Sequence, residues 1–203
     1  MKKIYIYTLL LLTIIIICVL WFFYKPEPIE SSSSAENSNA ERPIKTTLLE
    51  AYKIGIAKAF EYDEKAVLLH MNSIDDGEES GINGEKSTWQ LLIALPSKNQ
   101  RVGLTVKDQR ITKTEMLKGV TTEYSIIKEK DIKVDSKNVV KKAISEFSLE
   151  PGGRKNFVFK GYQFKLIKEN GILFLTVVGN RGAEKMEIHY NGETGDYLGR
   201  IEG

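Results

Sequence analysis

Hydrophobic side chains recur at helical spacing in two stretches of the chain. The first stretch begins at Thr47-Leu48-Leu49-Glu50, which fits the capping box that opens many helices. Its apolar positions are Leu48, Leu49, Tyr52, Ile56, Ala59 and Phe60. The second stretch follows Asp135, a favourable N-cap residue, and its apolar positions are Val139, Val140, Ala143, Ile144 and Phe147. The sequence therefore predicts two amphipathic helices, each with one face to bury.

Strand patterns follow each of the two helix patterns. After the first helix, apolar and polar residues alternate in segments 66–72, 89–95 and 101–106. After the second helix, the extended segments are 157–167, 172–178, 185–190 and 196–200. Asn170-Gly171 separates the first two of these, and Asn-Gly is a preferred pair for a tight hairpin.

The plan helix, strand, strand, strand thus occurs twice, about 85 to 90 residues apart. The copies share few identical residues, and the equivalent positions are Phe60 with Phe147, Trp89 with Phe174, and Val102 with Met186. The sequence predicts an α+β fold of two small units, 46–130 and 131–203. Each unit is expected to pack one helix on one face of its own antiparallel sheet and to leave the other face open.

Residues 4–24 form an uncharged apolar run that follows Lys2 and Lys3. A helix of that length spans roughly 31 Å, close to the hydrocarbon thickness of a bilayer. The run predicts a transmembrane anchor over 1–24, with the N-terminus in the cytoplasm and the bulk of the chain outside the cell. A cleaved signal peptide is the alternative, but the run is long and no Ala-x-Ala site follows it. A lipoprotein signal is disfavoured because Ile17 stands before Cys18, where such signals carry a small residue.

Residues 25–45 have the composition of a disordered tether. Three of the five prolines and a run of four serines lie here. Such a segment buries too little apolar surface to offset the entropy of ordering. A flexible chain of this length reaches roughly 25 Å, so it would hold the folded part a short way above the membrane.

The charge balance and the cysteine count exclude some functions. Lys and Arg number 29 against 27 Asp and Glu, a net charge of +2, whereas nucleic-acid proteins usually carry a strongly basic surface. We therefore expect no nucleic-acid partner. The single cysteine, Cys18, rules out an intrachain disulfide and a cysteine metal cluster.

Catalytic motifs are missing from the sequence. It contains no Gly-x-Ser-x-Gly and no His-Glu-x-x-His. His70 and His189 alternate with apolar residues, so we expect both on the open sheet faces, away from the helices. We predict no catalytic residue, no cofactor-binding residue and no metal ligand, although the spacing of carboxylates cannot by itself exclude an acidic pair.

Aromatic residues in the strand segments have two interpretations. They are either anchors of an interface or members of the core, and the enrichment of aromatics in strands favours the core. The residues concerned are Trp89, Tyr124, Tyr162, Tyr190 and Tyr197.

The second copy resembles a known family. Residues 171–182 read Gly-Ile-Leu-Phe-Leu-Thr-Val-Val-Gly-Asn-Arg-Gly, and residues 186–198 end in Asn-Gly-Glu-Thr-Gly-Asp-Tyr-Leu. A strand pair followed by a Thr-Gly turn into a short strand is similar to the PepSY domain, and the upstream helix 136–147 fits as well. The resemblance covers 135–203 and is weaker for 46–115. It implies a cystatin-like extracytoplasmic module that binds or restrains enzymes, and the whole chain resembles a small cell-wall elongation regulator.

Two hypotheses of function follow. The first is a membrane-tethered extracytoplasmic binding or regulatory module, not an enzyme, that acts on a cell-envelope protein or peptidase. The second is a cell-envelope hydrolase with an unrecognised carboxylate site. A deep pocket with convergent carboxylates would favour the hydrolase, and open sheet faces would favour the binding module.

Overall fold

The computed structural model describes residues 43–75, 77, 80–119, 125–153 and 159–203. The described residues belong to one compact unit, Arg42–Gly203. The predicted anchor and nearly all of the predicted tether lie outside the described residues. Within the described ranges, no helix is long and apolar enough to cross a membrane.

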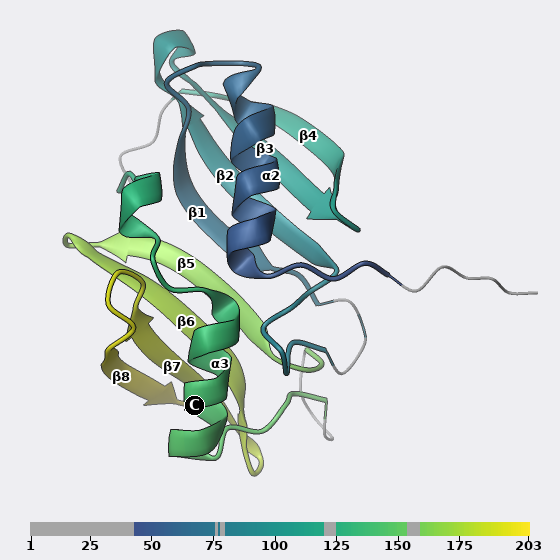
Figure 1. Cartoon of the computed structure of the whole chain (residues 1–203), viewed down its shortest axis with the longest axis vertical. Helices are drawn as coiled ribbons and strands as arrows, with labels where there is room; N and C mark the ends of the chain where they lie inside the picture. Colours follow the sequence, from purple (N-terminus) through teal and green to yellow (C-terminus); the bar gives the residue numbers. More distant parts are fainter. Residues whose placement is uncertain (1–42, 76, 78–79, 120–124, 154–158) are drawn as a thin grey trace, which may run out of the picture. The chain divides into compact units, whose positions relative to one another are not determined.

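The described part of the unit Arg42–Gly203 contains two α-helices and eight strands (Figure 1). In chain order the elements are α2 (Leu48–Phe60), β1 (Val67–Ser73), β2 (Thr88–Leu95), η1 (Pro96–Lys98), β3 (Gln100–Lys107), β4 (Arg110–Lys118), η2 (Glu129–Asp131), α3 (Ser136–Phe147), β5 (Gln163–Glu169), β6 (Ile172–Arg181), β7 (Glu184–Asn191) and β8 (Tyr197–Glu202).

All eight strands belong to one antiparallel sheet, and the prediction of two separate units was wrong. The strand order is β4-β3-β2-β1-β5-β6-β7-β8. The two halves join where Met71 of β1 pairs with Leu166 of β5 and Asn72 pairs with Lys165. Separate halves would leave the backbone groups of β1 and β5 unpaired and would each have a small core. Joining them satisfies those groups and merges the cores into one cluster.

Each half consists of a helix followed by four strands, one strand more than predicted for the first half. The missed strand is β4, which lies at the edge of the sheet and is exposed along most of its length. An edge strand that buries little carries little hydrophobic alternation. The hairpin from β3 to β4 turns at Asp108 and Gln109, whose φ values of 50° and 60° suit a two-residue turn of type I′.

Both helices begin where the sequence predicted. The capping box at α2 is confirmed, because the Glu50 N–H donates to Thr47 Oγ1 at 3.4 Å and the Thr47 N–H donates to Glu50 Oε2 at 2.9 Å. Asp135 is confirmed as the N-cap of α3, and its Oδ1 accepts from the Ser136 N–H at 2.8 Å.

The start of α3 also caps the start of α2. Asp135 Oδ1 accepts from the Leu49 N–H at 3.1 Å, and Ser136 Oγ accepts from the Leu48 N–H at 3.0 Å. The Ser136 hydroxyl donates in turn to the Gly84 carbonyl at 2.6 Å. Both Asp135 and Ser136 are buried. One pair of side chains therefore satisfies orphan N–H groups of two helices from different halves.

The core lies between the sheet and the two helices, which cover the same face (Figure 1). Trp89 of β2 is fully buried, stacks on Phe164 of β5 with ring centroids 6.0 Å apart, and donates from Nε1 to the Thr46 carbonyl at 3.1 Å. Tyr162 and Tyr190 are also buried, so the core interpretation is confirmed for these three aromatics. Tyr197 is 45% exposed, and Tyr124 lies outside the described residues.

We expect Asp135→Ala to destabilise the protein by about 2 kcal/mol, because an N-cap contributes about 1 kcal/mol and this one serves two helices. Thr47→Ala is the matched control, since Thr47 caps α2 alone, and should cost about 1 kcal/mol. Urea denaturation of both variants gives the free energies of unfolding. Equal losses would show that Asp135 does not stabilise α2.

Candidate functional site

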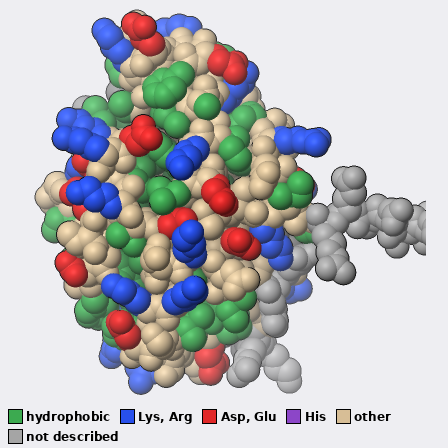
Figure 2. All heavy atoms as spheres, viewed as in Figure 1, with side chains coloured by type: hydrophobic (Ala, Val, Ile, Leu, Met, Phe, Trp, Pro, Cys, Tyr) green, Lys and Arg blue, Asp and Glu red, His purple; other side chains and the backbone are tan. Residues whose placement is uncertain are grey.

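The face of the sheet opposite α2 and α3 is the candidate site. No helix of the described chain packs on this face, whereas the other face is covered (Figure 1). The helix-covered side mixes basic, acidic and apolar side chains without a large area of one charge (Figure 2). A charged partner therefore finds no strong attraction on the helix-covered side.

A row of polar side chains crosses the open face. The strand register places one residue of each of seven strands in this row: Lys113, Thr105, Gln90, Asn72, Lys165, Thr176 and His189. We call these seven residues the polar row. It spans six inter-strand spacings of roughly 4.8 Å, about 29 Å in all. The row joins both halves, because Asn72 and Lys165 are partners across the β1–β5 pairing.

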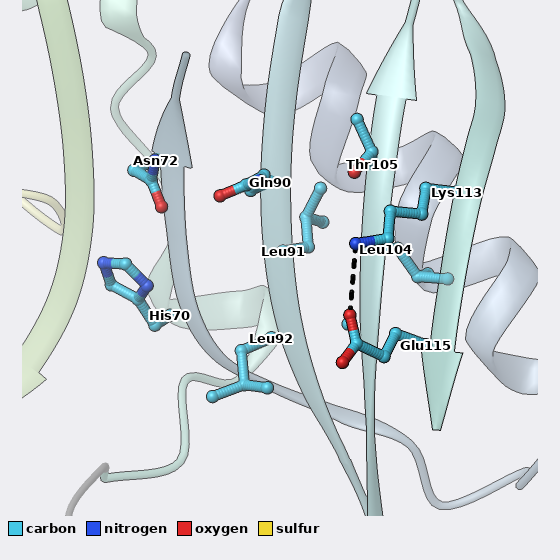
Figure 3. A pocket seen from close by; sticks show the side chains of 10 residues that line it. His70, Asn72, Gln90, Leu91, Leu92, Leu104, Thr105, Lys113 and Glu115 are labelled. Atoms are coloured by element: carbon cyan, nitrogen blue, oxygen red, sulfur yellow. Dashed lines mark ion pairs between the residues drawn. The ribbon is translucent and has the colours of Figure 1, made fainter. Parts of the chain in front are cut away.

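Two shallow hollows lie along the polar row, one in each half. The first, of about 210 Å³, is lined by His70, Asn72, Gln90, Leu92, Thr105, Lys113 and Glu115 among others (Figure 3). Lys113 Nζ and Glu115 form an ion pair of 3.2 Å at its outer side. The second, of about 200 Å³, is lined by Lys165, Ile167, Glu169, Phe174, Thr176, Glu187, His189 and Ile201. Both hollows are partly open to solvent.

Both histidines lie on the open face, as the alternation of apolar residues predicted. The alternation places Val67, Leu69 and Met71 on the helix side, and this was partly wrong, because Leu68 rather than Leu69 belongs to the core beneath the helices. A bulge between Leu68 and His70 shifts the register there and restores Met71 to the core side. A bulge of one residue cannot be recognised from the hydrophobic pattern of the strand alone.

Burial is the main cause of a lowered pKa at both histidines. Burial, with Lys165 second, lowers the pKa of His70 to about 4. Burial also lowers the pKa of His189, with a smaller contribution from Lys165 and an opposing one from Glu187 and Glu169. His189 Nδ1 is hydrogen-bonded to Thr176 Oγ1 at 2.9 Å. Near neutral pH the two histidines therefore offer hydrogen bonds rather than charge.

One pair of side chains that sequence reasoning missed resembles a nucleophile and its base. Lys86 Nζ donates to Ser80 Oγ at 2.6 Å, a contact found in some Ser-Lys hydrolases. Ser80 is only 4% exposed and Lys86 is fully buried. The Tyr162 N–H also donates to the Ser80 carbonyl. This backbone hydrogen bond connects the loop before β2 to the residue that precedes β5. It is closed to a substrate.

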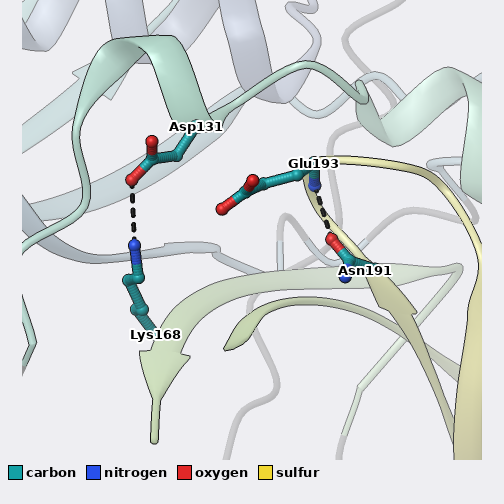
Figure 4. A network of polar contacts seen from close by, with 4 residues as sticks. All are labelled: Asp131, Lys168, Asn191 and Glu193. Carbon is teal, nitrogen blue, oxygen red and sulfur yellow. Dashed lines mark hydrogen bonds and ion pairs between the residues drawn. The ribbon is translucent and has the colours of Figure 1, made fainter. Parts of the chain in front are cut away.

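A second polar pair holds the connection between the halves. Asp131 of η2 and Lys168 of β5 form an ion pair of 2.9 Å, with side chains 12% and 18% exposed (Figure 4). The hydrogen bond from Lys168 lowers the pKa of Asp131. Nearby, Asn191 Oδ1 accepts from the Glu193 N–H at 2.8 Å and shapes the turn that follows β7. These contacts lie away from the polar row and stabilise the fold.

The part of the chain that the structure describes contains no set of side chains arranged to bind a metal ion. No group of three His, Cys, Asp or Glu side chains converges there. The carboxylate of Glu115 on the open face is held by Lys113.

Comparisons with known proteins give the fold alone. No family model matches the chain and no curated protein matches it, so the resemblance to PepSY stays a prediction. Among solved structures, the chain is similar to the crystal structure of a "putative lipoprotein" from Clostridium difficile 630, with a TM-score of 0.56 and 12% sequence identity. The similarity covers 80% of this chain and 97% of that chain.

We expect acidification to destabilise the wild type more than a His70→Gln variant. The pKa of His70 is about 4 in the folded protein, against 6.5 for a histidine in an unfolded chain, so the unfolded chain binds this proton more readily. The contribution of His70 to the free energy of unfolding is therefore complete above pH 6.5, where its imidazole is neutral in both states. This contribution is lost as the pH falls toward 4. Urea unfolding at pH 7 and pH 4.5 measures the difference. A parallel decline of both proteins, or an NMR titration of His70 near pH 6.5, would contradict it.

Proposed function

We propose that the protein is a membrane-tethered, extracytoplasmic binding module that holds a cell-envelope protein on its open sheet face. The polar row carries this proposal. Within the described residues, the side chains of Gln90, Thr105 and Lys165 make no hydrogen bond or ion pair. Their donors and acceptors face outward across both halves of the sheet, where a partner can use them.

The shape of the face favours a macromolecule over a small ligand. Small-molecule sites are usually clefts of 300 Å³ or more that enclose most of the ligand, and each hollow here is smaller and open. A row of about 29 Å matches the width of a standard protein interface. Ile167 and Phe174 lie beside the polar groups and add the apolar contact that such interfaces use.

The N-terminal segments support the location. The apolar run at 4–24 with Lys2 and Lys3 before it favours attachment to the membrane with the folded unit outside. A tether of about 20 residues raises the effective concentration of the module toward other membrane proteins.

The alternative of a cell-envelope hydrolase has less support. A carboxylate mechanism needs two acidic groups aimed at one substrate. Three glutamates line the two hollows, and Glu115 is paired with Lys113 and Glu187 with Lys185. Only Glu169, which shares the second hollow with Glu187, makes no ion pair within the described residues. The peptidase that the PepSY resemblance implies is therefore proposed as a partner.

We expect protease added to intact, wall-stripped cells to degrade residues 46–203. The positive-inside rule places Lys2 and Lys3 in the cytoplasm and the folded unit outside. An antibody to the C-terminal region follows the digestion, and a cytoplasmic protein serves as the control for lysis. Protection until the cells are lysed would refute the proposed location.

We expect Lys165→Glu to weaken partner capture about tenfold, because it reverses the charge at the centre of the polar row and so breaks the electrostatic match with the partner. Lys53→Glu is the matched control, because Lys53 is exposed on α2 and faces away from the polar row. In-cell crosslinking of the full chain identifies the captured protein, and titration of that protein against both variants gives the affinities.

Thermal unfolding of both variants checks that the fold is kept. If Lys165→Glu and Lys53→Glu capture the same protein equally well, the open face is not the binding surface.

A further inference from the structure

The two edges of the sheet differ in a way that points to a second interaction surface. The outer edge strand β4 carries Arg110, Lys113 and Lys118, and such charges discourage pairing with another strand. The edge strand β8 has no lysine, and its two charged residues, Arg200 and Glu202, form an ion pair with each other. Tyr197, Leu198 and Ile201 on β8 are 45%, 40% and 58% exposed, and they are three of the nine large apolar side chains exposed in the described chain.

The hydrogen bonds of β7 and β8 decide which groups of β8 face outward. The Lys185 N–H donates to the Gly203 carbonyl, and the Gly203 N–H donates back to Lys185, both at 3.1 Å. Hydrogen-bonded and non-bonded pairs alternate along an antiparallel ladder. The backbone N–H and C=O groups of Ile201 therefore point toward β7, whereas those of Arg200 and Glu202 point away from the sheet.

We propose that β8 pairs antiparallel with β8 of a second copy of this chain. In the register that we infer, Arg200 stands opposite Glu202 of the second copy, and Glu202 stands opposite Arg200 of the second copy. Their backbone groups then bond across the two-fold axis. The two side chains already form an ion pair of 3.0 Å within one chain, so both project to the same side.

The charges select this register over its neighbours. Sliding the second copy by two residues places either Arg200 opposite Arg200 or Glu202 opposite Glu202, and like charges directly opposite are destabilising. In the favoured register Ile201 faces Ile201 of the second copy on the open face, and this covers the most exposed side chain of β8. Because Ile201 also lines the second hollow, the open faces of the two copies become one surface.

A disulfide at the two-fold axis tests the pairing. The test uses the full chain in detergent, with Cys18→Ser to remove the native thiol. Ile201→Cys then places one sulfur of each copy at the two-fold axis, where the paired Cα atoms lie about 4.5 Å apart. This distance is within disulfide range. We expect a disulfide dimer under mild oxidation. Met116→Cys is the matched control on the other edge, since Met116 is 45% exposed on β4, and it should stay monomeric.

A charge swap tests the register. Arg200→Glu alone and Glu202→Arg alone should each weaken dimerisation about tenfold, because each places like charges opposite one another. The double variant restores opposite charges across the pair but loses the ion pair of 3.4 Å between Arg181 and Glu202 within each chain. It should therefore recover most of the wild-type affinity, and the dissociation constants are measured by analytical ultracentrifugation in detergent. A dissociation constant that the single variants leave unchanged, or equal crosslinking of Ile201→Cys and Met116→Cys, would overturn the proposal.

Discussion

The fold depends on the meeting of two helix N-termini at Asp135 and Ser136. The first N–H groups of a helix have no partner within it, and the N-terminal ends of α2 and α3 carry partial positive charges that repel. The Asp135 carboxylate accepts from both helices and neutralises both ends. Because this contact fixes α2 against α3, it also brings β1 beside β5, where the sheet becomes continuous.

The candidate site is a consequence of that junction. Both helices lie on one face, so the other face is bare over the width of the whole sheet. The register across β1 and β5 brings Asn72 next to Lys165, which extends the polar groups of one half into those of the other. Lys165 then lies close enough to both histidines to lower their pKa values. Neither half alone would present this arrangement.

Local features of the fold were predictable from the sequence, whereas contacts between residues far apart in the chain were not. The caps at Thr47 and Asp135 were predictable because the groups involved are three residues apart or fewer. The β1–β5 pairing was not, since Asn72 and Lys165 are far apart in the chain and any open strand edge is a chemically acceptable partner. The polar row was missed for the same reason. The faces of His70 and His189 followed from alternation, but the bulge beside His70 did not.

The strand order also indicates the sequence in which the parts of the sheet form during folding. Of the seven pairings among the described strands, six join strands that follow each other in the chain, and only β1–β5 joins distant ones. Paired strands that follow each other are joined by connections of 14 residues or fewer, which close at a smaller entropic cost than a contact between residues 72 and 165. We expect the two halves to acquire their hairpins early and to join late. Until they join, β1 and β5 are the long unpaired edges of two half-sheets, and the newly made chain is then most exposed to aggregation.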